Sequence, residues 1–218
     1  MPPQVKRERF YRAIQRVAAS RGVKTILEVG ASSGEGSTEA LVSGALANPE
    51  GPPAIHTIEV SKVRFQALAE RYREYAFVNC YNVSSIPADQ FPSEEEVTRF
   101  YREVRSKLRN SRLEKVLGWL RQDLAYIDEH PELSAPGIER IKATAKVDVF
   151  DAVLLDGSEF TGERELGLVD GARFILLDDT RSFKNWRSQE RLLVDSRYRR
   201  IAWSWFFRNG WAAFERVR

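Results

Sequence analysis

A short apolar run near the start of the chain leads directly into three closely spaced glycines, in the stretch Thr25-Ile-Leu-Glu-Val-Gly30-Ala-Ser-Ser-Gly34-Glu-Gly36. Glycine has no Cβ, so its backbone reaches positive φ angles and can come close to a bound molecule. A strand that ends in such a loop and continues into a helix holds nucleotide-like ligands in many α/β proteins. The spacing Gly-x-x-x-Gly-x-Gly, preceded by Glu28, differs from the Gly-x-Gly-x-x-Gly of dinucleotide-binding proteins, and it lacks the Gly-Lys-Ser/Thr ending of phosphate-binding loops.

Acidic and polar residues follow the other predicted strands in the same way. Glu59 ends the apolar run 54–59, and a carboxylate at that place can accept both hydrogen bonds of a ribose diol. Three further groups follow the runs 77–81, 147–155 and 172–177: they are Asn82-Val-Ser84, Asp156-Gly-Ser-Glu159 and Asp178-Asp179-Thr180. Ligands of open parallel sheets bind beyond the carboxyl ends of the strands, so we expect these five strand ends to form one crevice. Taken singly, each group has a simpler interpretation as a turn or a helix cap.

The elements that must position these residues alternate regularly in the first part of the chain. Periodicity predicts strands at 25–29, 54–59 and 77–81, with helices at about 36–46 and 61–74 between them. Such alternation implies right-handed crossovers and a parallel sheet. Before the first strand, apolar residues at helical spacing predict a short amphipathic helix within residues 1–20 that packs on the domain. A basic arm for an anionic partner is the alternative there.

The alternation stops between residues 87 and 146, where amphipathic helices replace the strand pattern. Ser93 and Glu96 have the spacing of a capping box at the start of one helix. A second helix carries apolar residues from position 113 to 127 and ends at His130-Pro131, and a third short one follows Pro136-Gly137. We therefore predict a helical insertion between the third and fourth strands.

The sheet pattern resumes at 147–155 and 172–177, followed by a helix at about 184–195 and by strands at 199–206 and 211–217. The last two strands flank an Asn-Gly pair, which favours a tight hairpin turn. The predicted fold is α/β and Rossmann-like, with a seven-stranded, mostly parallel sheet and a C-terminal antiparallel hairpin. We expect a single domain over residues 1–218.

Composition limits the classes of protein that fit. The chain has 218 residues, of which 43% are hydrophobic, and this suffices for one full core. The net charge of +3 gives only weak support for a nucleic-acid partner. No apolar run approaches the roughly 18 residues that cross a bilayer. The single cysteine, Cys80, cannot form an internal disulfide, which is consistent with a reducing compartment. We expect a cytoplasmic protein without a membrane partner, and a homo-oligomer is compatible with the sequence.

The glycine loop with its preceding acid, together with the acid that ends the second strand, resembles the class I methyltransferases that depend on S-adenosylmethionine (SAM). The resemblance implies that SAM is the cofactor and that its ribose is bound by Glu59. It also implies that Glu28 holds the glycine loop. The residues that would line the methionine and ribose portion of SAM are Gly30, Ala31, Ser32, Gly34 and Gly36. Asn82 and Ser84 would lie beside the adenine, where the family often has an acid.

The later strand ends are similar to those of the metal-dependent small-molecule O-methyltransferases of the catechol, macrocin and cephalosporin-pathway type. This similarity implies a small hydroxylated acceptor and a Mg²⁺ or similar ion held by Asp156, Asp178 and Asp179. Three crowded carboxylates either have raised pKa values or surround a hard cation. A metal-free site, in which these acids cap helices and bind the ligand directly, is the alternative.

A hydroxyl acceptor also has to lose its proton. Related enzymes often carry a Lys or His base three residues after the acid of the fourth strand, and this chain has Glu159 at that place. The predicted catalytic set is therefore Glu159, Lys184 and Asp156. The alternative for Glu159 is a metal ligand or a loop residue. The alternative for Lys184 is a solvated residue at the start of a helix.

Two other function classes compete with this interpretation. An NAD-dependent oxidoreductase shares the acid of the second strand but needs the other glycine spacing. An RNA methyltransferase or a nucleic-acid-binding module would use the arginines on phosphates.

Overall fold

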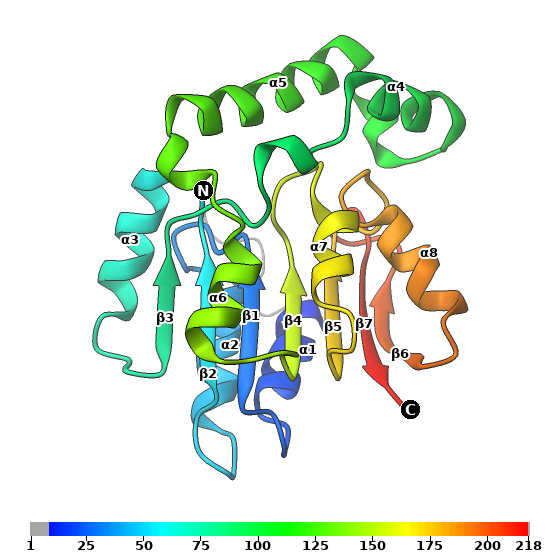
Figure 1. Cartoon of the computed structure of the whole chain (residues 1–218). Helices are drawn as coiled ribbons and strands as arrows, with labels where there is room; N and C mark the ends of the chain where they lie inside the picture. Colours follow the sequence, from blue (N-terminus) through cyan, green and yellow to red (C-terminus); the bar gives the residue numbers. More distant parts are fainter. Residues whose placement is uncertain (1–8, 218) are drawn as a thin grey trace.

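The computed structural model describes residues 9–217, and at its centre lies a seven-stranded sheet with the order β3-β2-β1-β4-β5-β7-β6 (Figure 1). Neighbouring strands are parallel from β3 to β5, whereas β7 runs antiparallel to both β5 and β6. The predicted mostly parallel sheet with a C-terminal antiparallel hairpin is therefore confirmed. The strands are β1 (Thr25–Val29), β2 (Ala54–Ile58), β3 (Val78–Tyr81), β4 (Ala152–Leu155), β5 (Phe174–Asp178), β6 (Tyr198–Ser204) and β7 (Trp211–Arg216).

Helices cover both faces of the sheet because successive strand residues point to opposite sides. Ile26 of β1 packs in one apolar cluster with α1 (Arg9–Ala18), α2 (Ser37–Leu46) and α3 (Lys62–Tyr72). Leu27, the next residue, packs in a second cluster with α6 (Gly137–Ala145), α7 (Gly162–Leu168) and α8 (Trp186–Val194). The central strands β1, β4 and β5 are buried on both faces, which explains their nearly continuous apolar sequences.

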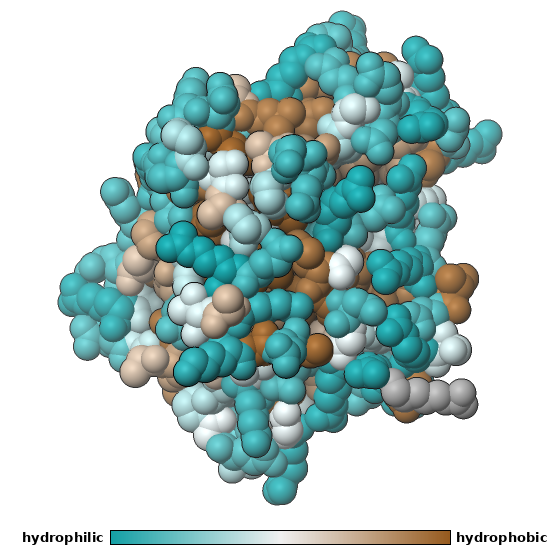
Figure 2. All heavy atoms as spheres, viewed as in Figure 1, coloured by the Kyte–Doolittle hydropathy of each residue, from teal (hydrophilic) through white to brown (hydrophobic). Residues whose placement is uncertain are grey.

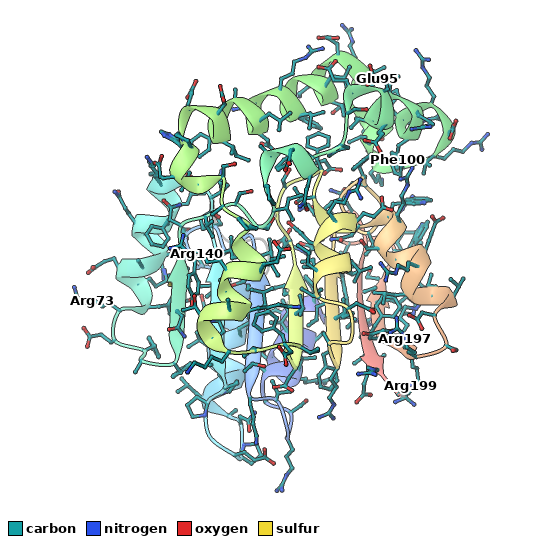
Figure 3. All side chains as sticks on the ribbon, in the orientation of Figure 1. Arg73, Glu95, Phe100, Arg140, Arg197 and Arg199 are labelled. Carbon is teal, nitrogen blue, oxygen red and sulfur yellow. The ribbon has the colours of Figure 1, made fainter. Side chains whose placement is uncertain are left out.

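The chain between β3 and α6 lies across the carboxyl ends of the strands, at the top of Figure 1. It contains α4 (Glu94–Glu103) and α5 (Leu113–Glu129), with single-turn 3-10 helices at Ala88–Gln90, Lys107–Asn110 and Pro131–Leu133. These helices form a third apolar cluster, which joins the rest of the molecule through Phe160 and Phe183. The rings of Phe100 and Phe183 meet edge to face with centroids 4.8 Å apart, and Figure 3 labels Phe100 beneath α4.

Several local predictions are confirmed in detail. Ser93 and Glu96 form the capping box at the start of α4, and α5 ends just before His130-Pro131. Asn209 and Gly210 both have positive φ angles in the β6–β7 hairpin. Helix α7 was not predicted, because its seven residues are too few to show a helical period. Strand β4 begins at residue 152 and not at 147, because Lys146 ends α6 in a left-handed conformation and a loop follows.

Hydrophilic residues cover most of the face shown in Figure 2. Within the described part of the chain, no helix combines the length and the apolar character needed to cross a membrane. The amphipathic helix predicted near the start is confirmed as α1, which buries Phe10, Ile14 and Val17. The basic arm was the alternative for residues 1–20, and residues 1–8 of that stretch lie outside the described residues.

Candidate functional site

A cavity of about 470 Å³ lies beyond the carboxyl ends of β1 to β4, and α5 forms its outer wall. This volume is within the range of small-molecule sites. Four of the five predicted strand ends contribute to the lining, which consists of Val29, Gly30, Ser32, Ile58 to Ser61, Arg64, Val83 to Ser85, Phe91, Gln122, Asp123, Tyr126, Ile127, Asp156 to Ser158 and Thr161. The fifth strand end lies beside Asp156 and completes a cluster of carboxylates.

The glycine loop is packed so tightly that it needs its glycines. Gly30 has φ +89°, and a Cβ there would lie 2.1 Å from the backbone oxygen of Asp156. Gly34 has φ +80°, and its carbonyl oxygen accepts a 2.5 Å hydrogen bond from the Tyr72 hydroxyl. The loop is thus held between β4 and α3. Of the loop residues predicted to contact a cofactor, Gly30 and Ser32 line the cavity. The other three predicted residues, Ala31, Gly34 and Gly36, do not line it.

Glu28, in the strand that precedes this loop, connects it to neighbouring elements. It is fully buried, and its Oε2 accepts hydrogen bonds from the hydroxyls of Thr38 and Thr57, each at 2.7 Å. Burial raises the pKa of Glu28. Because Thr38 belongs to α2 and Thr57 to β2, the carboxylate ties three elements together, which fits the predicted role of holding the loop.

Glu59 lies on the cavity wall with both carboxylate oxygens already oriented. Its Oε2 accepts a 2.7 Å hydrogen bond from the backbone N–H of Ser32, and its Oε1 accepts one of 2.8 Å from Ser61. A carboxylate has about four lone-pair sites, so each oxygen can accept one further hydrogen bond. The side chain is therefore fixed but still able to bind a diol in the cavity.

The two residues predicted beside adenine have different positions. Asn82 donates to the carbonyl oxygens of Glu59 and Val60 at 2.8 and 3.0 Å and does not line the cavity. Ser84 does line it, and its hydroxyl donates to the Ile86 carbonyl oxygen at 2.6 Å. The side chain of Asn82 therefore secures the loop after β2.

The neighbouring Ser85 also lines the cavity, and sequence reasoning missed it. Its hydroxyl lies 2.5 Å from Oε1 of Glu165, a fully buried residue of α7 whose pKa is raised by burial. No sequence motif links Ser85 with Glu165, because the pair is 80 residues apart in the chain.

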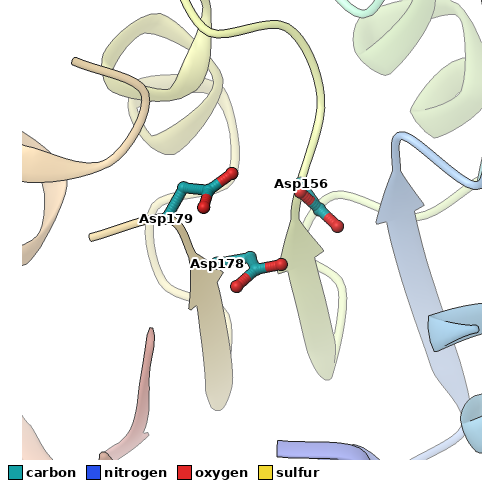
Figure 4. Close-up of side chains that lie close together, drawn as sticks. All are labelled: Asp156, Asp178 and Asp179. Carbon is teal, nitrogen blue, oxygen red and sulfur yellow. The ribbon is translucent and has the colours of Figure 1, made fainter. Parts of the chain in front are cut away.

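Asp156, Asp178 and Asp179 lie together at the ends of the adjacent strands β4 and β5 (Figure 4). One oxygen from each lies within 4.8 Å of the others. Asp178 is buried, and the guanidinium of Arg208 binds both of its oxygens. Burial and the charge of Asp156 raise the pKa of Asp178, while Arg208 opposes that rise. Other arginines, such as Arg73, Arg197 and Arg199, lie at the periphery (Figure 3).

Lys184 places its ammonium group among these carboxylates. Its Nζ donates to Oδ1 of Asp156 at 2.8 Å and to Oδ2 of Asp179 at 2.9 Å. The residue is buried, but Asp156 and Asp179 hold its pKa well above the usual value. A lysine paired with two carboxylates is stabilised in its protonated form, and this arrangement favours a role as a cation over the predicted role as a base.

The carboxylates, as they stand, do not fit a divalent ion. Such an ion takes about six oxygen ligands. Here the oxygens of Asp178 are bound by Arg208, and those of Asp179 by Lys184 and by Asn209 at 3.1 Å. Asp156 has one oxygen on Lys184 as well. The predicted cluster exists, but two side-chain cations, Lys184 and Arg208, already contact its carboxylates.

The predicted base Glu159 does not line the cavity. Its Oε1 accepts a 3.3 Å hydrogen bond from the backbone N–H of Lys184, on the side of the β5–α8 connection. Burial raises the pKa of Glu159. Its position next to the backbone of Lys184 favours the alternative of a loop residue.

Asp123 of α5 lines the cavity, and sequence reasoning missed this residue too. Its Oδ2 accepts a 2.5 Å hydrogen bond from the hydroxyl of Ser158, in the loop after β4. Burial raises the pKa of Asp123. A carboxylate with a raised pKa that faces a cavity has the properties of a general base. In the sequence it is one polar residue on an amphipathic helix, and nothing distinguishes it from its neighbours.

Comparison with known proteins finds similarity in fold. No protein-family model matches the chain, and neither does any curated protein. Among solved structures, a methyltransferase from Geobacter sulfurreducens is similar with a TM-score of 0.54 and 8% identity, covering 99% of this chain and 81% of the other. An O-methyltransferase from Bacillus cereus, solved in complex with SAH, has a TM-score of 0.50 and 13% identity over 94% of this chain and 80% of its own.

A protein from Corynebacterium glutamicum has a TM-score of 0.53 and 10% identity, covering 95% of this chain and 80% of the other. At these identities the comparisons establish the fold alone. The chain has the Rossmann-like fold of the SAM-dependent methyltransferases.

Proposed function

We propose that this protein transfers a methyl group from SAM to a hydroxyl group of a small acceptor. One observation carries the proposal: Gly30, Ser32, Glu59 and Asp156, all selected from sequence as parts of one site, line the same cavity. The methyltransferase fold supports this interpretation but does not by itself define the reaction.

The geometry supports a particular placement of the cofactor. The carboxylate of Glu59 would accept the ribose hydroxyls, and the loop from Gly30 to Ser32 would approach the methionine portion. Ser84 and Ser85 would lie near the adenine. The positively charged sulfonium would then lie toward Asp123 and Asp156, two carboxylates that line the cavity. Their negative charge favours binding of a sulfonium.

Asp123 is the base that the geometry favours. Methyl transfer to an alcohol is an in-line displacement in which the acceptor oxygen bonds to the methyl carbon while the carbon–sulfur bond breaks. The acceptor hydroxyl gives its proton to the Asp123 carboxylate, and the electron pair of the broken bond stays on sulfur as S-adenosylhomocysteine leaves. Orientation of the acceptor against the methyl group supplies much of the rate. Ser158 would keep the Asp123 carboxylate aimed into the cavity.

No proposed step uses the magnesium ion predicted from the sequence. A divalent ion in such a site would polarise the acceptor oxygen and lower its pKa. The cations that contact the three carboxylates here are Lys184 and Arg208.

Ligand-dependent melting tests the proposal against the oxidoreductase. At a concentration about 100 times its Kd, a ligand adds about 2.7 kcal/mol to the free energy of unfolding. We expect SAM and S-adenosylhomocysteine to raise the Tm by several degrees and NAD to leave it unchanged. Stabilisation by NAD without stabilisation by SAM would refute the proposal. Methyl-labelled SAM with a panel of catechols, sugars and phenols then identifies the acceptor class.

A further inference from the structure

We infer that the ammonium group of Lys184 takes the position that a divalent ion would need between Asp156 and Asp179, so that this site operates with a built-in lysine cation. The Nζ atom bridges one oxygen of each carboxylate, at 2.8 and 2.9 Å. The lysine side chain is 9% exposed, which leaves the ammonium little alternative contact with water. The inference concerns the same site as the proposed function, and only its consequence for catalysis rests on that function.

The backbone around Lys184 is held from both sides. The amide of Asn185 donates to the carbonyl oxygens of Leu155 and Asp178, at 3.0 and 2.7 Å, and so ties this segment to the ends of β4 and β5. On the other side, a Cβ at Gly162 would lie 2.1 Å from the carbonyl oxygen of Lys184. The same two strand ends carry the carboxylates, so the packing delivers the lysine directly between them.

The charges of the cluster are nearly balanced without an ion. Lys184 and Arg208 bring two positive charges to the three carboxylates, and burial raises the pKa of Asp178, which lowers the negative charge of the cluster. Arg208 binds Asp178 and places its Nη2 4.0 Å from Oδ2 of Asp156. A divalent ion among these oxygens would have to displace the ammonium, which would leave a buried lysine without its partners.

Lys184 does not line the cavity, whereas its partner Asp156 does. We therefore describe Lys184 as a positioning residue: it orients the Asp156 carboxylate and places a positive charge directly beside it. In an enzyme built this way, methyl transfer proceeds without an added metal.

The experiment is a titration of chelator-treated protein with Mn²⁺, in which electron paramagnetic resonance measures the free ion. We expect the wild-type protein to show no saturable site below about 1 mM, a weak limit for oxygen-ligand sites. Lys184→Met keeps the length of the side chain but removes its charge, and it should gain one Mn²⁺ site with at least tenfold higher affinity. Lys142→Met is the matched control, because the ammonium group of that lysine donates to the carbonyl oxygen of Leu168 on α7. It should behave like wild type.

Two results would overturn the inference. One is stoichiometric, tight Mn²⁺ binding by wild type that Asp179→Asn abolishes; the other is a folded Lys184→Met variant that gains no site. If Lys184→Met does not fold, the wild-type titration and an assay of methyl transfer in excess EDTA decide the question. Loss of methyl transfer in EDTA that Mn²⁺ restores would overturn the inference. Unchanged methyl transfer in EDTA would support it. SAM binding by calorimetry in the same samples tests the proposed function separately.

Discussion

The hydroxyl of Ser158 donates a 2.5 Å hydrogen bond to the carboxylate of Asp123, across a distance of 35 residues in the chain. Ser158 belongs to the loop after β4 and Asp123 to α5, so the bond joins the sheet to the wall supplied by the insertion. The helix is held at a second point, where the Tyr126 hydroxyl accepts a 3.0 Å hydrogen bond from the backbone N–H of Lys62. The carboxylate of Asp123 is thereby fixed at the cavity.

Asp123→Asn should lower the rate of methyl transfer by about 100-fold, because general bases contribute factors of this size or larger. The SAM Kd from calorimetry should rise by a much smaller factor, because the amide keeps the size of the side chain and Asp156 remains beside the sulfonium. Asp128→Asn, on the exposed face of the same helix, is the control and should have the wild-type rate. A rate within twofold of wild type for Asp123→Asn would exclude Asp123 as the base.

Glu59→Ala should weaken SAM binding by at least about tenfold. Hydrogen bonds to charged groups contribute about 1.5 to 3 kcal/mol each, and a factor of ten in Kd corresponds to about 1.4 kcal/mol. Isothermal calorimetry measures the change. Glu70→Ala is the control, because Glu70 is an exposed residue of α3 that pairs with Arg73 outside the cavity. Equal affinity in the Glu59 and Glu70 variants would remove the ribose assignment.

Gly30→Ala should destabilise the protein by about 3 kcal/mol or more, because the new methyl group would collide with the Asp156 carbonyl oxygen and the residue would keep a positive φ. The Tm should fall by about 6 °C or more. In contrast, Gly118→Ala in α5 has open space around its Cβ and should stabilise the helix by about 1 kcal/mol. Calorimetric melting of the two variants makes the comparison, and a Gly30→Ala protein as stable as wild type would contradict this packing.

Glu165→Gln should gain stability relative to wild type as the pH rises. Burial raises the pKa of Glu165 in the folded protein above 4.5, the usual value, which the unfolded chain keeps. At a pH between the unfolded and the folded pKa, the folded protein therefore holds a proton that the unfolded chain has lost. The wild-type free energy of unfolding therefore falls across this window, by at most about 1.4 kcal/mol per pH unit for one group. Glutamine does not titrate and lacks this loss. Urea unfolding at pH 5 and pH 8 measures the difference, with exposed Glu163→Gln as the control. A pH-independent difference between Glu165→Gln and wild type would show that the carboxyl does not titrate in this range.

The sequence was sufficient for most of the fold and for half of the site. Strand patterns, the glycine loop and the acids at strand ends are local signals, and the structure places Gly30, Glu59 and Asp156 around one cavity. The partners of the acids could not be predicted in this way. Lys184 was predicted as a catalytic residue, with a solvated helix start as the alternative, and neither included its contact with Asp156, which depends on how the segment before α8 approaches β4.

Asp123 and the pair formed by Ser85 and Glu165 were missed for a related reason. Each depends on contacts between segments distant in the chain. On an amphipathic helix, a carboxylate that faces a ligand has the same spacing as one that faces water. Only the angle at which α5 crosses the strand ends distinguishes Asp123 from Asp128.

The helices of the insertion have an apolar cluster distinct from the two that stabilise the sheet. Residues 91–127 can therefore change in sequence while the two clusters that stabilise the sheet stay intact. Because Gln122, Asp123 and Tyr126 of this segment line the cavity, replacing it would alter the cavity wall without altering the sheet.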